Sequence, residues 1–352
     1  MKQICANPAT APAGKLTMHT LSQRHQTGLT MVELLVALVI SLMISLAAIA
    51  ALTMTRRGFN TVDASSQLRD NGRFAADLIQ RLTVQSGFKD TFYAATQPNA
   101  AEIAANIAAN IKGFNNAKIN STGPLNSATA RTAGSLGFGS DVLILRYQEA
   151  ETIPGSGVSD RSMIDCAGNS SGVIPSSRDD RSASILHVAE SPTGSGELAL
   201  MCTYTNPSTG NWDTQPIVDN VENFQVLYGV DGTTLTPNTA FIGAQDSVPD
   251  AYLRANQMVV ASAPNSAATN ANWRRVRSVR IGMVLRGPAN SAQDIAVQTL
   301  YPFGKGKASA TGTAGSAMSS TTDKGTVFAA PADGRLRQVL TFTVHLRNNQ
   351  EL

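Results

Sequence analysis

The sequence predicts an α+β protein in which a long N-terminal helix, transmembrane and then amphipathic, packs on a C-terminal antiparallel β-rich head. The first observation is an apolar run, residues 34–55, that contains no charged residue, Gly or Pro. At about 1.5 Å per residue this run would extend roughly 33 Å as a helix, enough to cross a bilayer core of about 30 Å. The other two observations are a helical spacing of apolar residues after this run and a series of short β-like segments further along the chain.

The helix is expected to continue beyond the membrane over residues 56–88. Gly87 is a natural stop for it. The apolar residues that repeat at helical spacing in this stretch are Leu68, Ala75, Leu78, Ile79 and Leu82.

The remainder of the chain, residues 89–352, is expected to form the globular β-rich head. A short helix is predicted from Asn99 to Gly113. Two stretches rich in Ala, Ser, Thr and Gly, 254–272 and 303–325, predict long surface loops. The clearest predicted strands are 141–147, 184–189, 198–204, 221–228, 276–285 and 337–346, and the mixed polarity of 221–228 predicts a half-buried strand.

The residues before the apolar run form a basic leader. Residues 1–28 contain Lys2, Lys15 and Arg24 and no Asp or Glu. A basic segment ahead of an apolar one is typical of an export signal, although this apolar run is too long for an ordinary secretory signal. A second Met, Met18, leaves two possible starts for the leader.

The leader meets the apolar run at the motif Gly28-Leu-Thr-Met-Val-Glu33. A basic leader that ends in Gly, followed by four residues, Glu and a long apolar segment, resembles the class III signal of type IV prepilins. The resemblance implies that a prepilin peptidase removes residues 1–28 by cutting between Gly28 and Leu29, and that it N-methylates Leu29. Leu29 departs from the Phe that is usual in major pilins. The alternative is a plain signal anchor that is never cut.

Glu33 lies at the edge of the apolar run, where an ionised carboxylate needs a partner. A charge at the centre of a membrane costs about 2.5–3.5 kcal/mol on insertion scales. Cleavage would leave a free amine on Leu29, which is cationic at neutral pH because its unperturbed pKa is about 8. The resemblance implies that Glu33 pairs with the terminal amine of a neighbouring subunit and sets the register of assembly. The alternatives are that Glu33 reaches the lipid headgroups or pairs with its own amine.

Small residues follow Glu33 along one face of the predicted helix. Small residues at such spacing let membrane helices approach closely, although Ala and Ser are common in any apolar helix. We therefore expect a helix-packing stripe formed by Ala37, Ser41, Ser45 and Ala48.

The charge balance argues against a general nucleic-acid binder. The chain has 28 Lys and Arg and 25 Asp and Glu, and without the three basic residues of the leader both counts are 25. A neutral chain lacks the electrostatic attraction on which nucleic-acid binding depends, so no nucleic-acid partner is expected.

Cysteines and flanking charges indicate the compartment. Cys5 lies in the leader, which leaves Cys166 and Cys202. In an oxidising periplasm this pair predicts a disulfide, and the alternative is two buried thiols. Arg56 and Arg57 compete with the charges of the leader under the positive-inside rule, but a long domain crosses the membrane largely regardless of them. We expect a single-pass inner-membrane anchor with a periplasmic C-terminal domain.

No pattern of catalytic, metal-binding or cofactor-binding residues stands out. His187 and His345 lack the Cys or carboxylate spacing of a zinc site and are predicted to be ordinary strand histidines. Residues 178–181 predict a solvated turn with local ion pairs. Residues 228–232 have too few acidic ligands for a calcium loop and predict a tight turn. The chain is expected to be neither an enzyme nor a metal or cofactor protein.

Segments beyond the anchor resemble PilW-type minor pilins of the type IV pilus, in the same order along the chain. No single segment is decisive, but their colinear order behind a prepilin-like leader makes the resemblance specific. The segments are 68–75, 86–88, 140–147, 165–166, the strand ending at 202, 221–231, 273, 276–280, 335–337 and 345–348.

The resemblance implies a pilin-like head and a non-enzymatic minor pilin that helps initiate type IV pilus assembly and sits at or near the pilus tip. The implied partners are other minor pilins, the major pilin, the prepilin peptidase, the inner-membrane assembly platform and a tip adhesin. One alternative is a minor pseudopilin of type II secretion, and another is a signal-anchored periplasmic binding module that does not polymerise. A third is a tip subunit that binds DNA through Arg274, Arg275, Arg277 and Arg280, although strand alternation is expected to split them over two faces.

Overall fold

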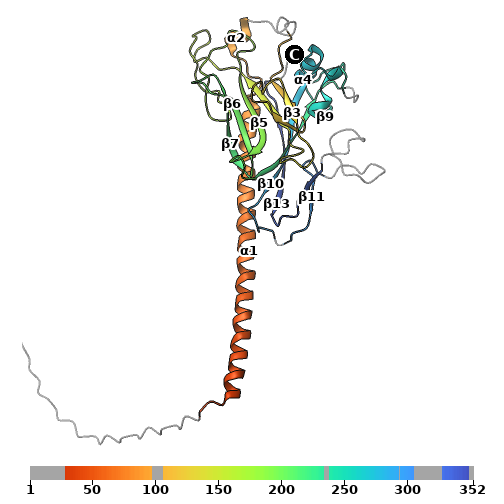
Figure 1. The fold of residues 1–352 in the computed structure, drawn as a ribbon. Helices are drawn as coiled ribbons and strands as arrows, with labels where there is room; N and C mark the ends of the chain where they lie inside the picture. The colour runs from red at the N-terminus through yellow and green to blue at the C-terminus, as the bar shows by residue number, and fades with distance from the viewer. Residues whose placement is uncertain (1–27, 97–105, 234–237, 293, 305–326, 349–352) are drawn as a thin grey trace, which may run out of the picture. The chain divides into compact units, whose positions relative to one another are not determined.

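The computed structural model describes residues 28–96, 106–233, 238–292, 294–304 and 327–348. The chain divides into two compact units, Met1–Thr55 and Arg56–Leu352, and the boundary falls inside the first helix, α1 (Met31–Gln85). The first unit contains the first part of α1, and the second contains the rest of α1 and a β-rich head (Figure 1). The predicted α+β fold class is confirmed.

The second part of α1 supplies one side of the core of the head. Its buried stripe packs with residues of both large sheets in one hydrophobic cluster. Two strands of the head face the stripe at Gly72, where an added Cβ would make ordinary van der Waals contacts with methyl groups of Leu340 at 3.5 Å and Leu285 at 3.7 Å. The helix ends at Gln85, and Gly87 follows with a φ of 81°, a left-handed conformation typical of helix ends. The predicted periodicity and stop are confirmed. The buried stripe consists of Ala64, Leu68, Gly72, Ala75, Ile79, Leu82 and Thr83.

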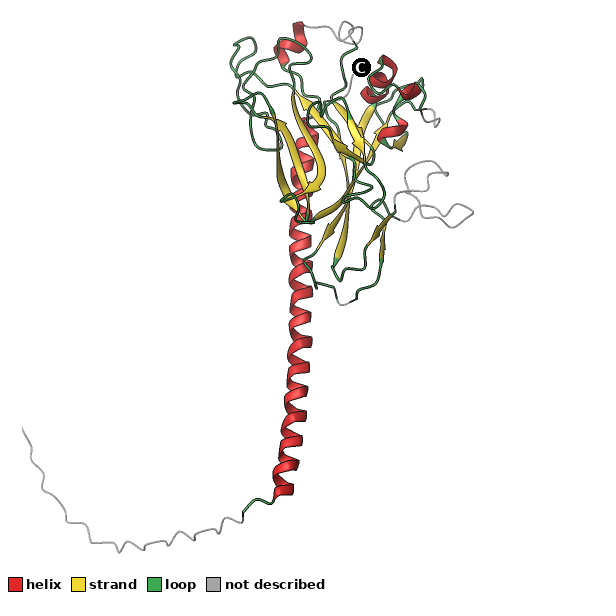
Figure 2. Cartoon of the chain, in the orientation of Figure 1, coloured by secondary structure: helices red, strands yellow, loops and turns green. Residues whose placement is uncertain are grey.

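Two antiparallel sheets form the body of the head (Figure 2). The first has the order β1 (Ile111–Phe114), β4 (Val142–Tyr147), β5 (Ser182–Glu190), β6 (Leu198–Thr205), β7 (Trp212–Asp219). The second has the order β13 (Arg337–His345), β10 (Val276–Arg286), β8 (Val221–Val230), β9 (Ala251–Leu253). Two smaller sheets pair β11 (Gln298–Leu300) with β12 (Phe328–Ala330) and β2 (Ala117–Ile119) with β3 (Ala128–Ala130). All six predicted strands are present.

Two predictions about individual elements were wrong. Strand β8 is buried along its whole length rather than half-buried, because it lies between β10 and β9 and strands β4, β5 and β6 pack against it. Ile111 belongs to strand β1, where it pairs with Leu145, and not to the predicted helix that starts at Asn99. Residues 99–105 of that predicted helix lie outside the described residues. A short helix that was not predicted, α2 (Thr91–Thr96), follows α1.

The segment 254–272, predicted to be a long loop, contains helical turns. They are η1 (Ala255–Gln257), η2 (Val260–Ser262) and most of α4 (Ala267–Arg274). Ser266 caps α4 by accepting a hydrogen bond from the backbone N–H of Thr269. The segment is held down by Trp273, which is 1% exposed and meets the ring of Tyr228 edge to face at 4.7 Å. Most of the other predicted loop, 303–325, lies outside the described residues.

A buried ion pair ties the start of β13 to β8. The Arg337 Nε donates to Glu222 Oε2 at 2.6 Å, and the Arg337 Nη2 donates to Asp333 Oδ2 at 2.7 Å. The side chain of Arg337 is 0% exposed and that of Glu222 is 7% exposed. Since an unpaired charge inside a protein is costly, each of these groups depends on the other.

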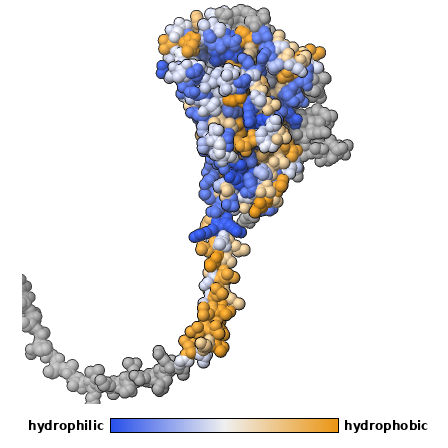
Figure 3. Space-filling view, viewed as in Figure 1, coloured by the Kyte–Doolittle hydropathy of each residue, from blue (hydrophilic) through white to orange (hydrophobic). Residues whose placement is uncertain are grey.

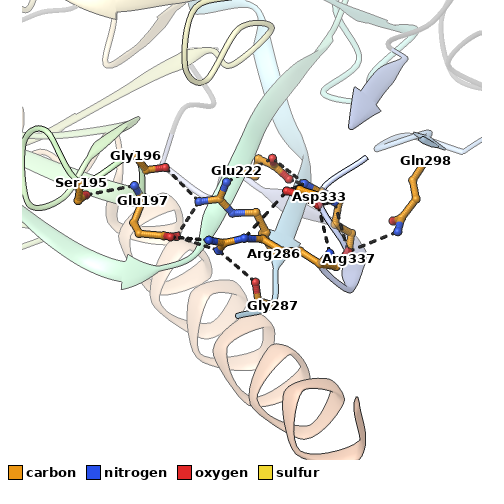
Figure 4. A network of polar contacts seen from close by, with 10 residues as sticks. Ser195, Gly196, Glu197, Glu222, Arg286, Gly287, Gln298, Asp333 and Arg337 are labelled. Carbon is orange, nitrogen blue, oxygen red and sulfur yellow. Dashed lines mark hydrogen bonds and ion pairs between the residues drawn. The ribbon is translucent and has the colours of Figure 1, made fainter. Parts of the chain in front are cut away.

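The same charge network reaches the first sheet through Glu197, in the connection between β5 and β6 (Figure 4). Glu197 accepts from Arg286 and from Arg335, each at 2.7 Å. The hydrogen bond from Arg335 is the main cause that lowers the pKa of Glu197 from its ordinary value. The network therefore fastens the end of the β5–β6 hairpin to the second sheet.

The Glu222→Gln variant tests how much this network contributes. It would leave Arg337 buried with Asp333 as its remaining carboxylate partner, and we expect the free energy of unfolding to fall by about 3 kcal/mol. Urea unfolding of the full chain in detergent, followed by near-UV circular dichroism, measures this change. Asp77→Asn is the matched control, because it breaks an exposed pair with Arg81 and should cost less than about 0.5 kcal/mol. Equal losses in the two variants would contradict the prediction.

Candidate functional site

The described part of the first unit exposes apolar side chains on all sides of its helix. The large apolar side chains from Leu29 to Met54 are 52–88% exposed. They form a nearly continuous apolar band in the space-filling view (Figure 3). By length and composition this helix can cross a membrane. Among residues 28–55 the single charged side chain is that of Glu33.

Glu33 closes the N-terminus of α1 in a capping box with Thr30. The Thr30 N–H and hydroxyl donate to Glu33 Oε2 at 3.1 and 3.2 Å, and the Glu33 N–H lies 3.3 Å from Thr30 Oγ1. The pair satisfies backbone donors that the helix itself leaves unpaired, and it places a negative charge at the positive end of the helix dipole. This role was not predicted from the sequence, although Thr followed three residues later by Glu is its signal.

Among the described residues, both hydrogen bonds that Thr30 donates in the capping box are accepted by Oε2 of Glu33, and Oε1 takes no part in the box. A carboxylate accepts several hydrogen bonds on its two oxygens. Glu33 can therefore cap its own helix and accept a second donor at the same time.

Gly28 and Leu29 lie directly before the helix in an exposed segment without regular structure. Leu29 is 76% exposed, and a Cβ added at Gly28 would meet nothing within 4 Å among the described residues. Both residues of the predicted cleavage site are therefore exposed in the part of the chain that the structure describes. Residues 1–27 of the predicted leader lie outside the described residues.

The predicted small-residue stripe lies on the exposed surface of α1. Its two hydroxyls are already used within the helix, because Ser41 Oγ donates to the carbonyl of Leu38 at 2.9 Å and Ser45 Oγ to that of Ser41 at 2.8 Å. Such internal bonds leave the hydroxyls without need of a partner from another helix. The stripe Ala37, Ser41, Ser45 and Ala48 thus offers a narrow, hydrogen-bond-satisfied surface, and its role in packing stays a prediction.

The histidine in strand β5 is an ordinary buried residue. His187 is 3% exposed, and its Nε2 lies 2.9 Å from the hydroxyl of Thr203. Burial lowers the pKa of His187 to about 4, so the ring is neutral at physiological pH. Among the described residues no group of three or more His, Cys, Asp or Glu is placed to hold a metal ion.

The four arginines considered for DNA binding do not form one basic face. Arg277 is buried and pairs with Asp231 at 3.1 Å. Arg275 and Arg274 donate to backbone carbonyls of neighbouring loops. Because at least three of the guanidinium groups bind the protein itself, the structure gives this region no exposed cluster for phosphates.

The turn at 178–181 is less solvated than predicted. Arg178 is 5% exposed, and the side chain of Arg181 is 1% exposed. The carboxylate of Asp179 forms ion pairs with Arg181 at 2.7 Å and with Arg146 at 3.3 Å. The predicted ion pairs are present, but their arginine side chains are buried rather than exposed to solvent.

Comparison with known proteins agrees with both the N-terminal motif and the head. Residues 185–348 match the model of the PilW family, described as type IV pilus-assembly protein W, and residues 23–49 match the prokaryotic N-terminal methylation motif. The N-terminal motif and the matched part of the head are those of a PilW-like type IV minor pilin. Among solved structures it is similar to a type IV-like pilin from Thermus thermophilus, with 12% identity over 81% of this chain and 98% of that chain and a TM-score of 0.34. A comparison with curated proteins gave no match.

A disulfide crosses the head of this minor pilin. It joins Cys166 to Cys202 of strand β6, with their Cα atoms 5.7 Å apart. Both residues are buried in the main core cluster. The bond therefore fastens the loop around residue 166 to the first sheet from within.

Removing the disulfide should destabilise the head. The bond closes a segment with a sequence separation of 36 residues, and chain entropy predicts a loss of about 3–4 kcal/mol in the Cys166→Ala, Cys202→Ala double variant. Thermal unfolding of the oxidised wild type, the reduced wild type and the double variant measures the loss. The reduced wild type should unfold near the temperature of the double variant. Unchanged unfolding on reduction would contradict the prediction.

A buried carboxylate joins the two sheets of the minor pilin. Asp141 is 5% exposed, and its two oxygens accept the backbone N–H groups of Asn116 and Val226 at 2.8 and 2.9 Å. Desolvation raises the pKa of Asp141 to about 7, against the opposing effect of these hydrogen bonds and of Arg254 and Arg131. The folded protein therefore holds a proton at Asp141 to a higher pH than the unfolded chain does.

This raised pKa gives stability a defined pH dependence. The stability contributed by the protonated Asp141 is fully present below the unfolded pKa of about 4. It is lost as pH rises to about 7. We expect the difference in free energy of unfolding, wild type minus Asp141→Asn, to fall over that range by roughly 3–4 kcal/mol and then to level off. Urea unfolding of both proteins at several pH values measures it, and the subtraction cancels all other titrating groups. A difference that rises or stays flat across this range would contradict the assignment.

Proposed function

We propose that this protein is a non-enzymatic minor pilin that helps initiate type IV pilus assembly and remains at or near the tip of the filament. One observation carries the proposal. An exposed Gly28–Leu29 bond stands directly before an apolar helix whose single carboxylate, Glu33, keeps an oxygen outside its capping box. The match to a family described as a pilus-assembly protein supports the role in assembly.

The chemistry of the N-terminus suits a two-step assembly. Cleavage after Gly28 by a prepilin peptidase converts the amide nitrogen of Leu29 into a cationic amine, which the same enzyme methylates. Thr30 and Glu33 both lie after the cut, so the capping box survives it. The Oε1 of Glu33 then accepts the amine of a neighbouring subunit, and two buried charges neutralise each other at the apolar margin.

The remaining features support the proposed topology. Residues 29–55 would anchor the subunit in the inner membrane, and the small-residue stripe on that helix would pack against the helices of neighbouring pilins. The head would lie in the periplasm, where an oxidising environment maintains the Cys166–Cys202 disulfide. Partners in this arrangement are other minor pilins, the major pilin, the assembly platform and a tip adhesin.

Three variants separate the intersubunit charge pair from the helix cap. Gln can replace Glu in a capping box, so Glu33→Gln keeps the cap and removes the charge, whereas Glu33→Ala removes both. Thr30→Ala weakens the cap and keeps the charge, and should cost about 1 kcal/mol of local helix stability. We expect both Glu33 variants to lose at least about tenfold in pilus number, because each leaves the amine of the neighbour unpaired. The Thr30 variant should assemble close to the wild-type level.

Surface pili counted by electron microscopy in a deletion strain, complemented with each variant, provide the readout. Mass spectrometry of the mature chain shows in each case whether Leu29 is exposed and methylated. Wild-type piliation with Glu33→Gln together with failure of Thr30→Ala would show that the cap alone matters. An intact leader in a strain that contains the peptidase would overturn the proposal as a whole.

A further inference from the structure

A large cavity lies on the second sheet, on the face that turns away from the main core. Phe224, Val226 and Tyr228 of strand β8 point into the core, and the alternate residues Asn223 and Gln225 line the cavity. Its volume is about 630 Å³, within the range of sites that bind ligands. The loop 134–139 forms one wall and residues 327–331, which include strand β12, form another.

The walls of the cavity are largely apolar, and its rim exposes apolar side chains. Leu136, Phe138, Val297 and Val327 all line it and are 43–66% exposed. Leu198, which is 4% exposed, lies deeper. A surface of this kind favours an occupant that removes apolar groups from water.

The polar residues of the cavity leave one acceptor without a partner. Asn223 Nδ2 donates to the carbonyl of Phe138 at 3.3 Å, which turns its Oδ1 toward Gln225. Gln225 Nε2 donates to that Oδ1 at 2.7 Å, and this fixes the orientation of the Gln225 amide. The Gln225 Oε1 is buried and has no hydrogen-bond partner among the described residues. A buried acceptor in this state favours an occupant that carries an N–H donor.

The charged residues that line the cavity already form ion pairs, although Nε of Arg286 has no hydrogen-bond partner among the described residues. They are Glu222 and Arg286, and both belong to the network that also contains Glu197 and Arg337. A charged occupant would be buried there without a counterion, which is costly. The cavity therefore selects an uncharged occupant.

Strand β12 supplies the backbone along one wall. In the described sheets it pairs with β11 alone, through Phe328, Ala329 and Ala330, so its second edge has no strand beside it. An extended peptide can add to such an edge through main-chain hydrogen bonds while its side chains fill neighbouring pockets.

From these observations we propose that the cavity binds an extended, uncharged peptide segment alongside β12. A bulky apolar side chain of the peptide would fill the cavity, and one of its N–H groups would be directed to Gln225. That such a segment is supplied by another pilus subunit rests on the proposed function. The peptide site itself does not, so it can fail while the role in assembly stands.

The test uses the full chain in lipid nanodiscs, labelled at Leu and Val methyl groups, and the capped pentapeptide Thr-Val-Trp-Val-Thr as the probe. We expect NMR shifts at Leu136, Leu198, Val297 and Val327 that saturate with the peptide. A matched peptide with Asp in place of Trp should bind at least about tenfold more weakly, because its charge would be buried unpaired. The Trp peptide methylated on both its central backbone nitrogen and its indole nitrogen should also bind about tenfold more weakly, because it loses both donors that could reach Gln225.

Two protein variants locate the site. Val327→Asp places a charge in the exposed part of the wall and should weaken binding of the Trp peptide at least about tenfold. Ile153→Asp is the control, since Ile153 is 69% exposed and does not line the cavity, and it should bind as the wild type does. If Val327→Asp fails to fold, binding of the N-methylated peptide to the wild-type protein still tests the proposed site. Absence of saturable shifts, equal binding of the charged peptide, or shifts elsewhere on the head would overturn the proposal.

Discussion

The structure depends on one helix that must satisfy two different environments. In residues 29–55 its apolar side chains are exposed on all sides, whereas after Arg56 only a stripe is buried, against the sheets of the head. That stripe contains Ala64, Gly72 and Ala75, and their small size lets the sheets approach the helix axis. The helix that anchors the chain is thus also part of the core of the head. Disturbing the stripe would loosen the head from the element that holds it in the membrane.

Strand β8 contains several polar side chains that are buried inside the head. Its polar residues are buried although they alternate with core residues, since Glu222, Asn223 and Gln225 are 5%, 0% and 2% exposed. Glu222 is neutralised by Arg337, and Asn223 is satisfied by Phe138 and Gln225. The Asn223–Gln225 pair leaves Oε1 of Gln225 without a hydrogen-bond partner among the described residues, beside the cavity. Most buried polar groups of folded proteins have a partner, and among the unsatisfied groups of the described residues the amide of Gln225 lines the cavity.

The sequence predicts elements whose signal is local and misses those that depend on neighbours. The anchor, the stop at Gly87 and six strands follow from periodicity and turn residues alone. Strand β7 was missed because it is an edge strand that contains Pro216 and few buried residues. Ile111 was assigned to a helix because its spacing fits either period, and its pairing with Leu145 decides for a strand. Likewise the cavity joins segments more than a hundred residues apart, which no local pattern records.

The capping box changes how the charge of Glu33 should be understood. An isolated carboxylate at the apolar margin would be costly before any partner arrives. Thr30 and the positive end of the helix dipole reduce that cost within a single subunit. The charge is therefore stabilised even when no amine lies beside it. In the proposed assembly, the amine of a neighbouring subunit would bind the remaining oxygen of Glu33. The three-residue spacing of Thr30 and Glu33 thus provides the helix cap, and the charge of Glu33 is available for the intersubunit pairing proposed above. The same residue type at another position of the first turn would retain the charge but lose the reciprocal cap.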